Sequence, residues 1–267
     1  MSVFKEDILK GKTALITGGG TGICKGIAET FARHGASLCI TSRKQENLDK
    51  AAKEITAATG AKVLPLAADV RKPEEIEGVV KKAAETLGGI DVVINGAAGN
   101  FPVPVAQLSY NGFHTVVAID LEGTFNVSKA CFPHLTAAGK KHGNANIINI
   151  TATLQYTGVP FQAHVSSAKA GIDALTRTLA NEWGSLGVRV NGIAPGPIGG
   201  TEGMKRLAPG PDGEKRAAKA IPLGRFGKIQ EIADAALFLI SDASKYTTGQ
   251  ILIIDGGQWI SRIPLGA

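Results

Sequence analysis

A glycine-rich turn directly follows the first apolar segment of the chain. Residues 13–17 can form a short buried strand, four glycines interrupt the pattern over residues 18–22, and a helical stretch follows over residues 23–34. Glycines at such a junction permit a tight turn and let backbone N–H groups reach an anion at the helix N-terminus. This feature predicts a nucleotide-phosphate site at the start of an α/β fold.

Strand and helix patterns alternate along the rest of the chain. Further strands are expected at the short apolar runs 37–41, 62–68, 91–95, 146–150, 188–193 and 251–254. Helices are expected between them, over 45–58, from Pro73, near 110–135, over 164–183 and over 229–240. Near-continuous apolar strands that alternate with helices are typical of a parallel sheet covered on both faces. We therefore predict a single α/β domain over 1–267, a Rossmann-type doubly wound sheet of about seven parallel strands with helices on both faces.

The net charge of +6, from 29 basic and 23 acidic residues, leaves two interpretations open. It is either scattered charge that favours solubility or a field that attracts an anionic ligand. The basic residues form no long run, and aromatic residues make up 5% of the chain, so a stacking platform is not indicated. We therefore expect no nucleic-acid partner.

Cysteine and histidine spacing argues against a disulfide framework and against a metal site. Cys24, Cys39 and Cys131 are odd in number, far apart and without a CxxC pair, which is typical of a reducing compartment. The five histidines do not cluster with cysteines or acids at metal-ligand spacing, so we expect no metal. No run reaches the roughly 18 apolar residues of a membrane span, so no membrane partner is expected either.

Neither terminus has the pattern of a targeting signal. Residues 1–10 mix charged and apolar side chains and contain no secretory apolar core. The chain closes on residues 264–267, Pro-Leu-Gly-Ala, which differ from an SKL-type peroxisomal address. From these residues alone we expect a cytoplasmic protein.

Two adjacent cations, Arg43 and Lys44, follow the second predicted strand. A site selective for NAD places an acidic residue near this point to bind the ribose hydroxyls. Cations suit a 2′-phosphate instead, although a solvated pair of loop charges would have the same sequence. We predict NADPH/NADP+ rather than NADH as the cofactor.

Several motifs together resemble the short-chain dehydrogenase/reductase family over about the whole chain: residues 17–24, Asp69-Val70, residues 95–99, Lys169 and Pro195-Gly196. The resemblance implies a cofactor site formed by Gly18, Gly20, Thr21, Gly22, Ile23, Arg43, Lys44, Asp69, Val70, Ala97, Lys169, Pro195, Gly196, Ile198 and Thr201. Cys24 departs from the family, because it stands where the fingerprint has its last glycine. Cysteine is small and adopts helical dihedrals, so we expect crowding near the cofactor rather than lost binding.

The acid that this family uses to reduce carbonyls is absent. The family places a tyrosine four residues before the helix lysine and a serine thirteen residues before that tyrosine, and here Val165 and Ala152 occupy these positions. Asp120 stands where the family usually has an asparagine. Either the chain binds the cofactor without catalytic activity, or it transfers hydride to a conjugated carbon–carbon double bond. In the second case negative charge spreads onto an enolate oxygen, which hydrogen-bond donors stabilise.

The replacement motifs resemble the 2,4-dienoyl-CoA reductases, most closely the peroxisomal type: residues 95–101, 119–120, 149–153 and 194–203. The resemblance implies NADPH-dependent reduction of a 2,4-dienoyl-CoA to a 3-enoyl-CoA in fatty acid β-oxidation, in the peroxisome. It also implies a homotetramer that packs through the helices near 110–135 and 164–183.

The resemblance assigns a role to four candidate catalytic residues. Asn100 donates to the thioester or dienolate oxygen, and Lys169 binds the nicotinamide ribose and adds positive potential. Asp120 is the candidate proton relay, directly or through a water, and Asp255 assists it. Tyr156 lies thirteen residues before Lys169, a spacing that does not match the catalytic tyrosine of the mitochondrial enzymes. We expect structural roles for Tyr156 and for His164.

A segment at about 195–228 is rich in glycine and proline and is basic, and we interpret it as a substrate lid. Coenzyme A carries several phosphates, which the basic residues of this segment could bind. Arg206 and Arg71 are the candidates for these phosphates, and Phe101, Ser109 and Asn111 lie where the acyl chain or pantetheine arm would pass. Two alternatives remain open. One is another short-chain reductase acting on an acyl thioester or an enone, and the other is a non-catalytic NADP-binding regulatory protein.

Overall fold

The computed structural model describes residues 4–201, 204 and 212–261, and their strands form one parallel sheet in the order β3-β2-β1-β4-β5-β6-β7. The strands are β1 (Thr13–Thr17), β2 (Ser37–Ser42), β3 (Val63–Ala67), β4 (Val92–Asn95), β5 (Ala145–Ile150), β6 (Val188–Pro195) and β7 (Ile251–Ile254). This order confirms the predicted doubly wound fold, and each strand lies within two residues of its expected bounds.

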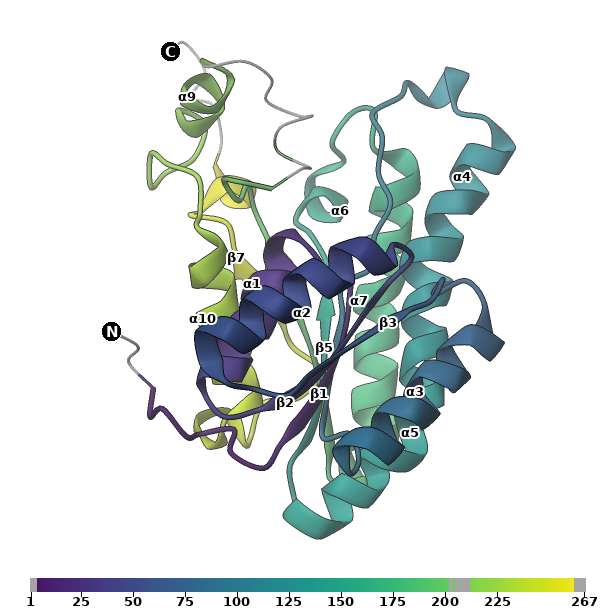
Figure 1. Ribbon diagram of the computed structural model, residues 1–267. Helices are drawn as coiled ribbons and strands as arrows, with labels where there is room; N and C mark the ends of the chain where they lie inside the picture. Colours follow the sequence, from purple (N-terminus) through teal and green to yellow (C-terminus); the bar gives the residue numbers. More distant parts are fainter. Residues whose placement is uncertain (1–3, 202–203, 205–211, 262–267) are drawn as a thin grey trace.

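Helices cover both faces of the sheet (Figure 1). One face carries α1 (Gly22–Arg33), α2 (Gln45–Thr59) and α10 (Ile229–Ile240). The opposite face carries α3 (Pro73–Leu87), α5 (Gly123–His142) and α7 (Ala163–Trp183). The shorter elements are α4 (Tyr110–Val117), α6 (Leu154–Thr157), α9 (Gly213–Ala218), η1 (Val105–Gln107), η3 (Gly184–Leu186), η4 (Asp242–Ser244) and η5 (Gln258–Ile260). Of these, α4 and α9 lie at opposite sides of the upper part of Figure 1, with α6 between them.

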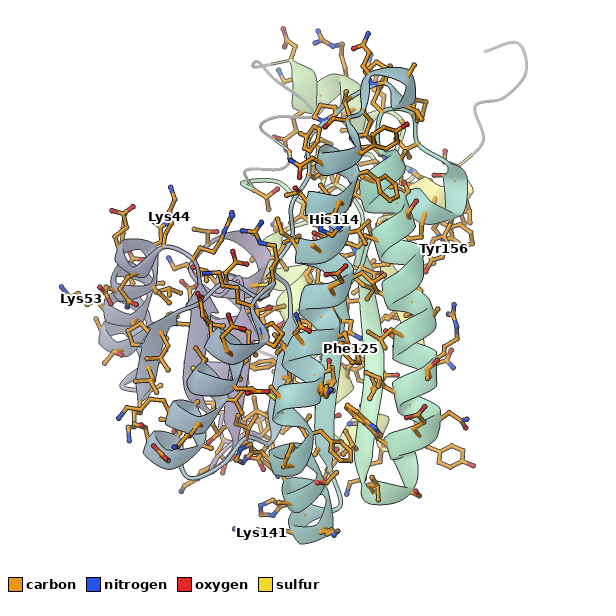
Figure 2. All side chains as sticks on the ribbon, turned by 90° about the vertical axis from the view of Figure 1, so that its right-hand side faces the viewer. Lys44, Lys53, His114, Phe125, Lys141 and Tyr156 are labelled. Atoms are coloured by element: carbon orange, nitrogen blue, oxygen red, sulfur yellow. The ribbon has the colours of Figure 1, made fainter. Side chains whose placement is uncertain are left out.

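The helix expected near 110–135 is longer than predicted and is not uniform. It runs from α4 through a π-helical turn, η2 (Ala118–Glu122), into α5 and ends at His142. Figure 2 shows this long helix from the side, with His114 on α4 and Phe125 on α5. A π turn closes i→i+5 hydrogen bonds and is often found at functional sites. The turn places Asp120, which is fully buried, on the inner side of the helix.

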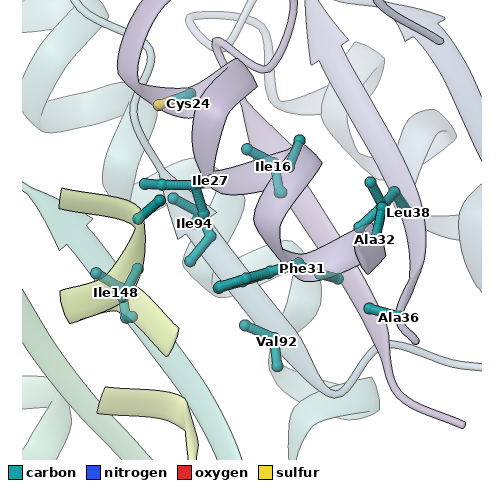
Figure 3. Packing of buried hydrophobic residues seen from close by; sticks show 14 of the residues in the cluster. Ile16, Cys24, Ile27, Phe31, Ala32, Ala36, Leu38, Val92, Ile94 and Ile148 are labelled. Atoms are coloured by element: carbon teal, nitrogen blue, oxygen red, sulfur yellow. The ribbon is translucent and has the colours of Figure 1, made fainter. Parts of the chain in front are cut away.

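Alternating side chains of the strands fill two separate cores. Along β1, Ala14 and Ile16 join the core under α1, whereas Leu15 joins the core under α3 and α5. Figure 3 shows Ile27 and Phe31 of α1 packed near the strand residues of the first core. Burying a side chain of this size stabilises the fold by about 1.5–3 kcal/mol, so the sheet and its helices form a rigid base for the residues at the strand ends.

The segment interpreted as a lid is described only in part. Strand β6 continues to Pro195, Ile198 pairs with Gly227 in an isolated bridge, and α9 follows further along the segment. Arg206, the predicted phosphate-binding residue, lies outside the described residues.

Candidate active site

A cleft of about 560 Å³ opens at the carboxyl ends of the strands, where doubly wound folds bind their ligands. Every residue predicted for the cofactor lines this cleft except Gly22 and Ile198. The floor also contains Val165 and Ala152, the residues that replace the tyrosine and serine of carbonyl reduction. The structure therefore places these two apolar side chains where the missing acid would have to act.

The glycine turn after β1 leaves room for an anion. Gly18 has a left-handed backbone, with φ of +69°, and a Cβ there would lie 2.8 Å from the carbonyl oxygen of Gly96. Thr21, the N-cap of α1, makes no side-chain capping bond, and the first turn of α1 contains no acidic residue. The N-terminal N–H groups of α1 are thus available to a phosphate. This geometry fits the pyrophosphate of a dinucleotide.

Cys24 occupies the space that a side chain at position 96 would need. A Cβ on Gly96 would lie only 2.0 Å from the Cys24 sulfur. Figure 3 shows Cys24 in the first turn of α1, above Ile27. Burial raises the pKa of the Cys24 thiol to about 12, against a smaller opposing effect of Lys169, so the thiol is neutral. The crowding expected from Cys24 is therefore relieved by a glycine on the neighbouring strand end.

Arg43 and Lys44 are exposed at one end of the cleft, and Asp69 lines the same end. Arg71 folds back onto this acid, because its Nε donates to both carboxylate oxygens of Asp69 at 3.0 Å. The guanidinium lowers the pKa of Asp69 below its ordinary value. Arg71 thus neutralises Asp69 in this structure, and it does not line the cleft.

Lys169 and Asp120 meet behind the cleft. The Lys169 ammonium donates to the Ile150 carbonyl at 3.0 Å and lies 3.1 Å from Oδ2 of Asp120. The other carboxylate oxygen, Oδ1, accepts a 2.7 Å hydrogen bond from the backbone N–H of Gly99. Asp120 is fully buried and Lys169 nearly so, and of the two only Lys169 lines the cleft. Asp120 therefore connects Lys169 to the turn that carries Asn100.

Of the remaining predicted site residues, Asn100 lines the cleft, whereas Phe101, Ser109, Asn111 and Asp255 are not among its lining residues. Asn100 is exposed at its rim, and Phe101 is 41% exposed next to it. Ser109 accepts a hydrogen bond from Gly112 and caps α4, while Asn111 is exposed in the first turn of that helix. The carboxylate of Asp255 accepts from the N–H groups of Gly257 and Trp259 at 2.9 and 2.7 Å. These contacts give Ser109 and Asp255 a capping function in the structure.

Tyr156 does not line the cleft. Its hydroxyl donates to Asp173 at 2.7 Å, and its ring lies 5.6 Å from that of Trp259. Burial and the Asp173 carboxylate both raise the pKa of Tyr156 above its ordinary value. The structural role expected for this residue agrees with these contacts.

Some residues of the cleft were not anticipated. Ser42 and Asn47 line it on either side of the cation pair, and Ile119, Thr151 and Leu154 line the opposite part. Ser42 and Asn47 could have been found from their closeness in sequence to Arg43 and Lys44. The others depend on strand and helix ends that meet only in three dimensions.

The described part of the chain contains no group of three or more histidine, cysteine or acidic side chains able to hold a metal ion. None of the helices within it combines the length and apolar character needed to cross a bilayer.

Sequence comparison gives a consistent set of relatives. A family model described as enoyl-(acyl carrier protein) reductase matches residues 18–258. The chain is 49% identical over 259 residues to the (3E)-enoyl-CoA-producing peroxisomal 2,4-dienoyl-CoA reductase of Danio rerio, covering 97% of this chain and 85% of that protein. The enzyme of the same name from Arabidopsis thaliana is 46% identical over 266 residues, covering 98% of this chain and 89% of that protein.

Solved structures agree with this result. A short chain dehydrogenase from Bacillus anthracis matches with a TM-score of 0.84 at 40% identity, covering 96% of this chain and 100% of that chain. A gluconate 5-dehydrogenase from Burkholderia cenocepacia, solved in complex with NADP and tartrate, matches with a TM-score of 0.88 at 29% identity, covering 97% of this chain and 99% of that chain.

Proposed function

Because the chain belongs to the short-chain dehydrogenase/reductase family, we propose that it is an oxidoreductase that reduces 2,4-dienoyl-CoA to 3-enoyl-CoA with NADPH, in the oxidation of unsaturated fatty acids. One observation carries the proposal. The cleft presents Val165 and Ala152 where a carbonyl reductase needs its acid, while Lys169 and the glycine turn are retained. The Danio rerio and Arabidopsis thaliana relatives are named for this reaction.

The residues at the cofactor end fit NADPH. The turn around Gly18 and the free N-terminus of α1 would take the pyrophosphate, and Arg43 with Lys44 would take the 2′-phosphate. The NADP found in the Burkholderia cenocepacia enzyme supports a nicotinamide dinucleotide in this fold. When bound, NADPH supplies the hydride that reduces the conjugated double bond.

Asn100 and Lys169 stabilise the negative charge that develops on the substrate. The Asn100 amide at the rim donates to the thioester oxygen, where the charge of the dienolate accumulates. The Lys169 ammonium adds positive potential from the floor of the cleft, and its hydrogen bond to the Ile150 carbonyl fixes its position. Both groups are in place before the charge forms.

Asp120 and Lys169 together form the proposed proton relay. Asp120 has no exposed surface, so it acts through the ammonium that it contacts rather than on the substrate itself. The relay delivers a proton to a carbon of the dienolate, directly or through a water held by the ammonium. Asp120 also holds Gly99, and so keeps the neighbouring Asn100 at the rim.

Charge supports an acyl-CoA as the substrate. Arg71 lies next to the cleft, and Arg206 and the basic segment at about 195–228 are the further proposed contacts to the phosphates of coenzyme A. Phe101, Ser109 and Asn111 would line the path of the acyl chain and pantetheine arm. The names of the two relatives support a peroxisomal location.

We also propose a homotetramer. Tyr110 of α4 is 98% exposed, and Phe125 of α5 is 46% exposed on the face seen in Figure 2. Large apolar side chains left exposed on these helices favour association with further copies of the chain. The mass of the protein in solution, measured by light scattering, tests this proposal.

The decisive experiment follows NADPH oxidation at 340 nm with 2,4-hexadienoyl-CoA, beside a 3-oxoacyl-CoA and a 2-enoyl-CoA. We expect turnover of the dienoyl thioester alone, with the 3-enoyl product identified by mass spectrometry and NMR. Faster turnover of the 3-oxoacyl-CoA or the 2-enoyl-CoA would contradict this proposal and indicate a reductase with a different substrate. NADPH binding without turnover of any of the three would favour the regulatory alternative.

A further inference from the structure

His164 is fully buried at the start of α7 and takes no part in the reaction proposed above. Its Nδ1 accepts a 2.8 Å hydrogen bond from the backbone N–H of Val165. The N-cap residue, Gln162, makes no side-chain capping bond, so the imidazole satisfies one of the unpaired N–H groups of the first turn. A ring nitrogen that accepts a hydrogen bond carries no proton, and the neutral ring then has its proton on Nε2.

The ring of His164 faces the loop that carries Asn100 and Phe101. Its edge packs against the Phe101 ring, with centroids 4.5 Å apart and an interplanar angle of 76°. Burial lowers the pKa of His164, while the Phe101 backbone and the Asp120 carboxylate oppose this effect. Nε2 is buried and makes no hydrogen bond of normal geometry within the described residues. The packing of the two rings is therefore the contact through which the buried imidazole reaches the residue next to Asn100.

The same loop is held at two other points. The Gly99 N–H donates to Asp120, and the Val103 N–H donates to the Phe161 carbonyl at 3.0 Å. Among the described residues, Phe161 is the one non-glycine residue with a positive φ, 67°. An L residue adopts this conformation only where its surroundings impose it. Asn100 and Phe101 lie between these two anchors, and His164 supports the middle of the span.

We propose that His164 is a positioning residue that packs on the Phe101 ring and thereby fixes the Asn100 amide at the rim of the cleft. The proposal rests on the proposed function, because it gives Asn100 the task of binding the thioester oxygen. The end of the cleft proposed for the phosphates of the cofactor is built by other elements, the turn after β1 and the end of β2. Loss of the His164 contact should therefore impair the acyl-CoA step and leave NADPH binding unchanged.

Two variants separate the two contacts of the imidazole. His164→Asn keeps an acceptor near the position of Nδ1 and removes the ring that packs on Phe101. His164→Phe keeps a ring of similar volume and removes the acceptor for the Val165 N–H. The measurements are kcat and KM for 2,4-hexadienoyl-CoA, the Kd of NADPH and the Tm. For wild type and each variant, hydrogen exchange of the peptide that spans residues 98–104 is measured without substrate.

We expect His164→Asn to lose about tenfold in kcat/KM, near the upper end of what an aromatic pair contributes, with faster exchange in residues 98–104. His164→Phe should keep kcat/KM and wild-type exchange, because it retains a ring against Phe101, and should lower the Tm, because the Val165 N–H loses its acceptor. The Kd of NADPH should stay the same in both. Wild-type kcat/KM and exchange in His164→Asn would overturn the proposal and reduce His164 to a helix cap.

The exchange measurement separates this proposal from the proposed function. If wild-type protein does not reduce the dienoyl thioester, the proposed function fails, and faster exchange in His164→Asn still supports the loop contact. If wild-type protein turns over the substrate and exchange is unchanged in His164→Asn, the positioning role fails alone.

Discussion

The ammonium nitrogen of Lys169 lies 3.1 Å from Oδ2 of Asp120, and the two side chains come from different helices of the same face. Both are buried, so neither charge is screened by water. Removing one partner of such a pair typically costs about 3–5 kcal/mol, because it leaves the other charge uncompensated. The contact therefore contributes to the joining of η2 and α7 as well as to the proposed chemistry.

Asp120→Asn should lower kcat for the dienoyl thioester by about a hundredfold, the lower end of the range for a proton-transferring group. The amide still accepts from Gly99, so the Kd of NADPH should change little. Steady-state kinetics and fluorescence titration of NADPH check the two expectations. Glu122→Gln, an exposed change on the same turn, is the matched control, and full activity in Asp120→Asn would remove the relay from the mechanism.

Gly96→Ala should weaken NADPH binding and lower the Tm, because its Cβ would overlap the Cys24 sulfur. The double variant Cys24→Gly with Gly96→Ala should restore both, since the glycine frees the space that the new methyl group fills. A double-mutant cycle on the free energy of unfolding measures this coupling. Gly78→Ala on α3 is the control, because a Cβ there meets nothing within 4 Å. Additive effects of the two changes would show that the side chains at positions 24 and 96 do not compete for the same space.

Tyr156→Phe should leave kcat unchanged and reduce the free energy of unfolding by about 1 kcal/mol, through loss of the hydrogen bond to Asp173. Urea denaturation and steady-state kinetics give the two values. Tyr110→Phe, at a residue that is 98% exposed, should alter neither. A large fall in kcat for Tyr156→Phe would instead indicate an acid of the mitochondrial type.

Replacing Arg43 and Lys44 together by alanine should raise the KM for NADPH about ten- to a hundredfold, the loss expected for one or two charge-assisted hydrogen bonds. The KM for NADH should stay nearly constant, because NADH lacks the 2′-phosphate. Lys53→Ala changes an exposed cation on the following helix, labelled in Figure 2, that does not line the cleft, and serves as a control for the loss of a surface positive charge. An equal rise in KM for NADPH and NADH would show that the two cations do not bind the 2′-phosphate.

Glu231 gives the stability of the chain a pH dependence in acid. Hydrogen bonds from Arg225, and then from the Lys228 backbone, lower the pKa of Glu231 from its ordinary 4.5 to about 2. An acid whose pKa is lower in the folded than in the unfolded chain stabilises the fold at pH values above its ordinary pKa. This contribution is lost as the pH falls toward the pKa of the folded state. Wild type should therefore exceed Glu231→Gln in Tm at pH 7, by a margin that shrinks below about pH 4.5.

Melting curves of both proteins between pH 7 and pH 3 measure this margin. Glu182→Gln, at an exposed glutamate, is the control. A margin that stays constant over the whole range would show that the ion pair with Arg225 does not stabilise the fold.

The fold was predictable because its signals are local. The apolar strands, the glycine turn and Pro73 at the start of α3 each follow from a few consecutive residues, and their expected bounds agree closely with the structure. The absence of the tyrosine used in carbonyl reduction could also be predicted, since Val165 stands at a fixed spacing from Lys169. Residues defined by such spacing lie at the cleft as expected.

The details that depend on long-range packing were not predictable. The π turn around Asp120 has no sequence period of its own, so the helix was expected to be continuous. The pairing of Arg71 with Asp69, two residues away, was not foreseen, and the assignment of Arg71 to a phosphate stays a prediction. The packing of His164 on Phe101 joins parts of the chain 63 residues apart, and no local pattern indicates it.

The π turn also constrains how chain length can vary among homologous proteins. It inserts one residue into a helix that otherwise closes every turn with i→i+4 bonds. Deleting one residue from 118–122 would restore a continuous α-helix, and α4 and α5 would keep nearly the same relative orientation, because the wider turn holds the extra residue locally. The change would fall on the residues of the turn itself, so the carboxylate behind Lys169 would be displaced while the rest of the helix stayed in place. A one-residue gap at this point of an alignment would therefore identify a chain that places its acid differently, even where every motif residue is retained.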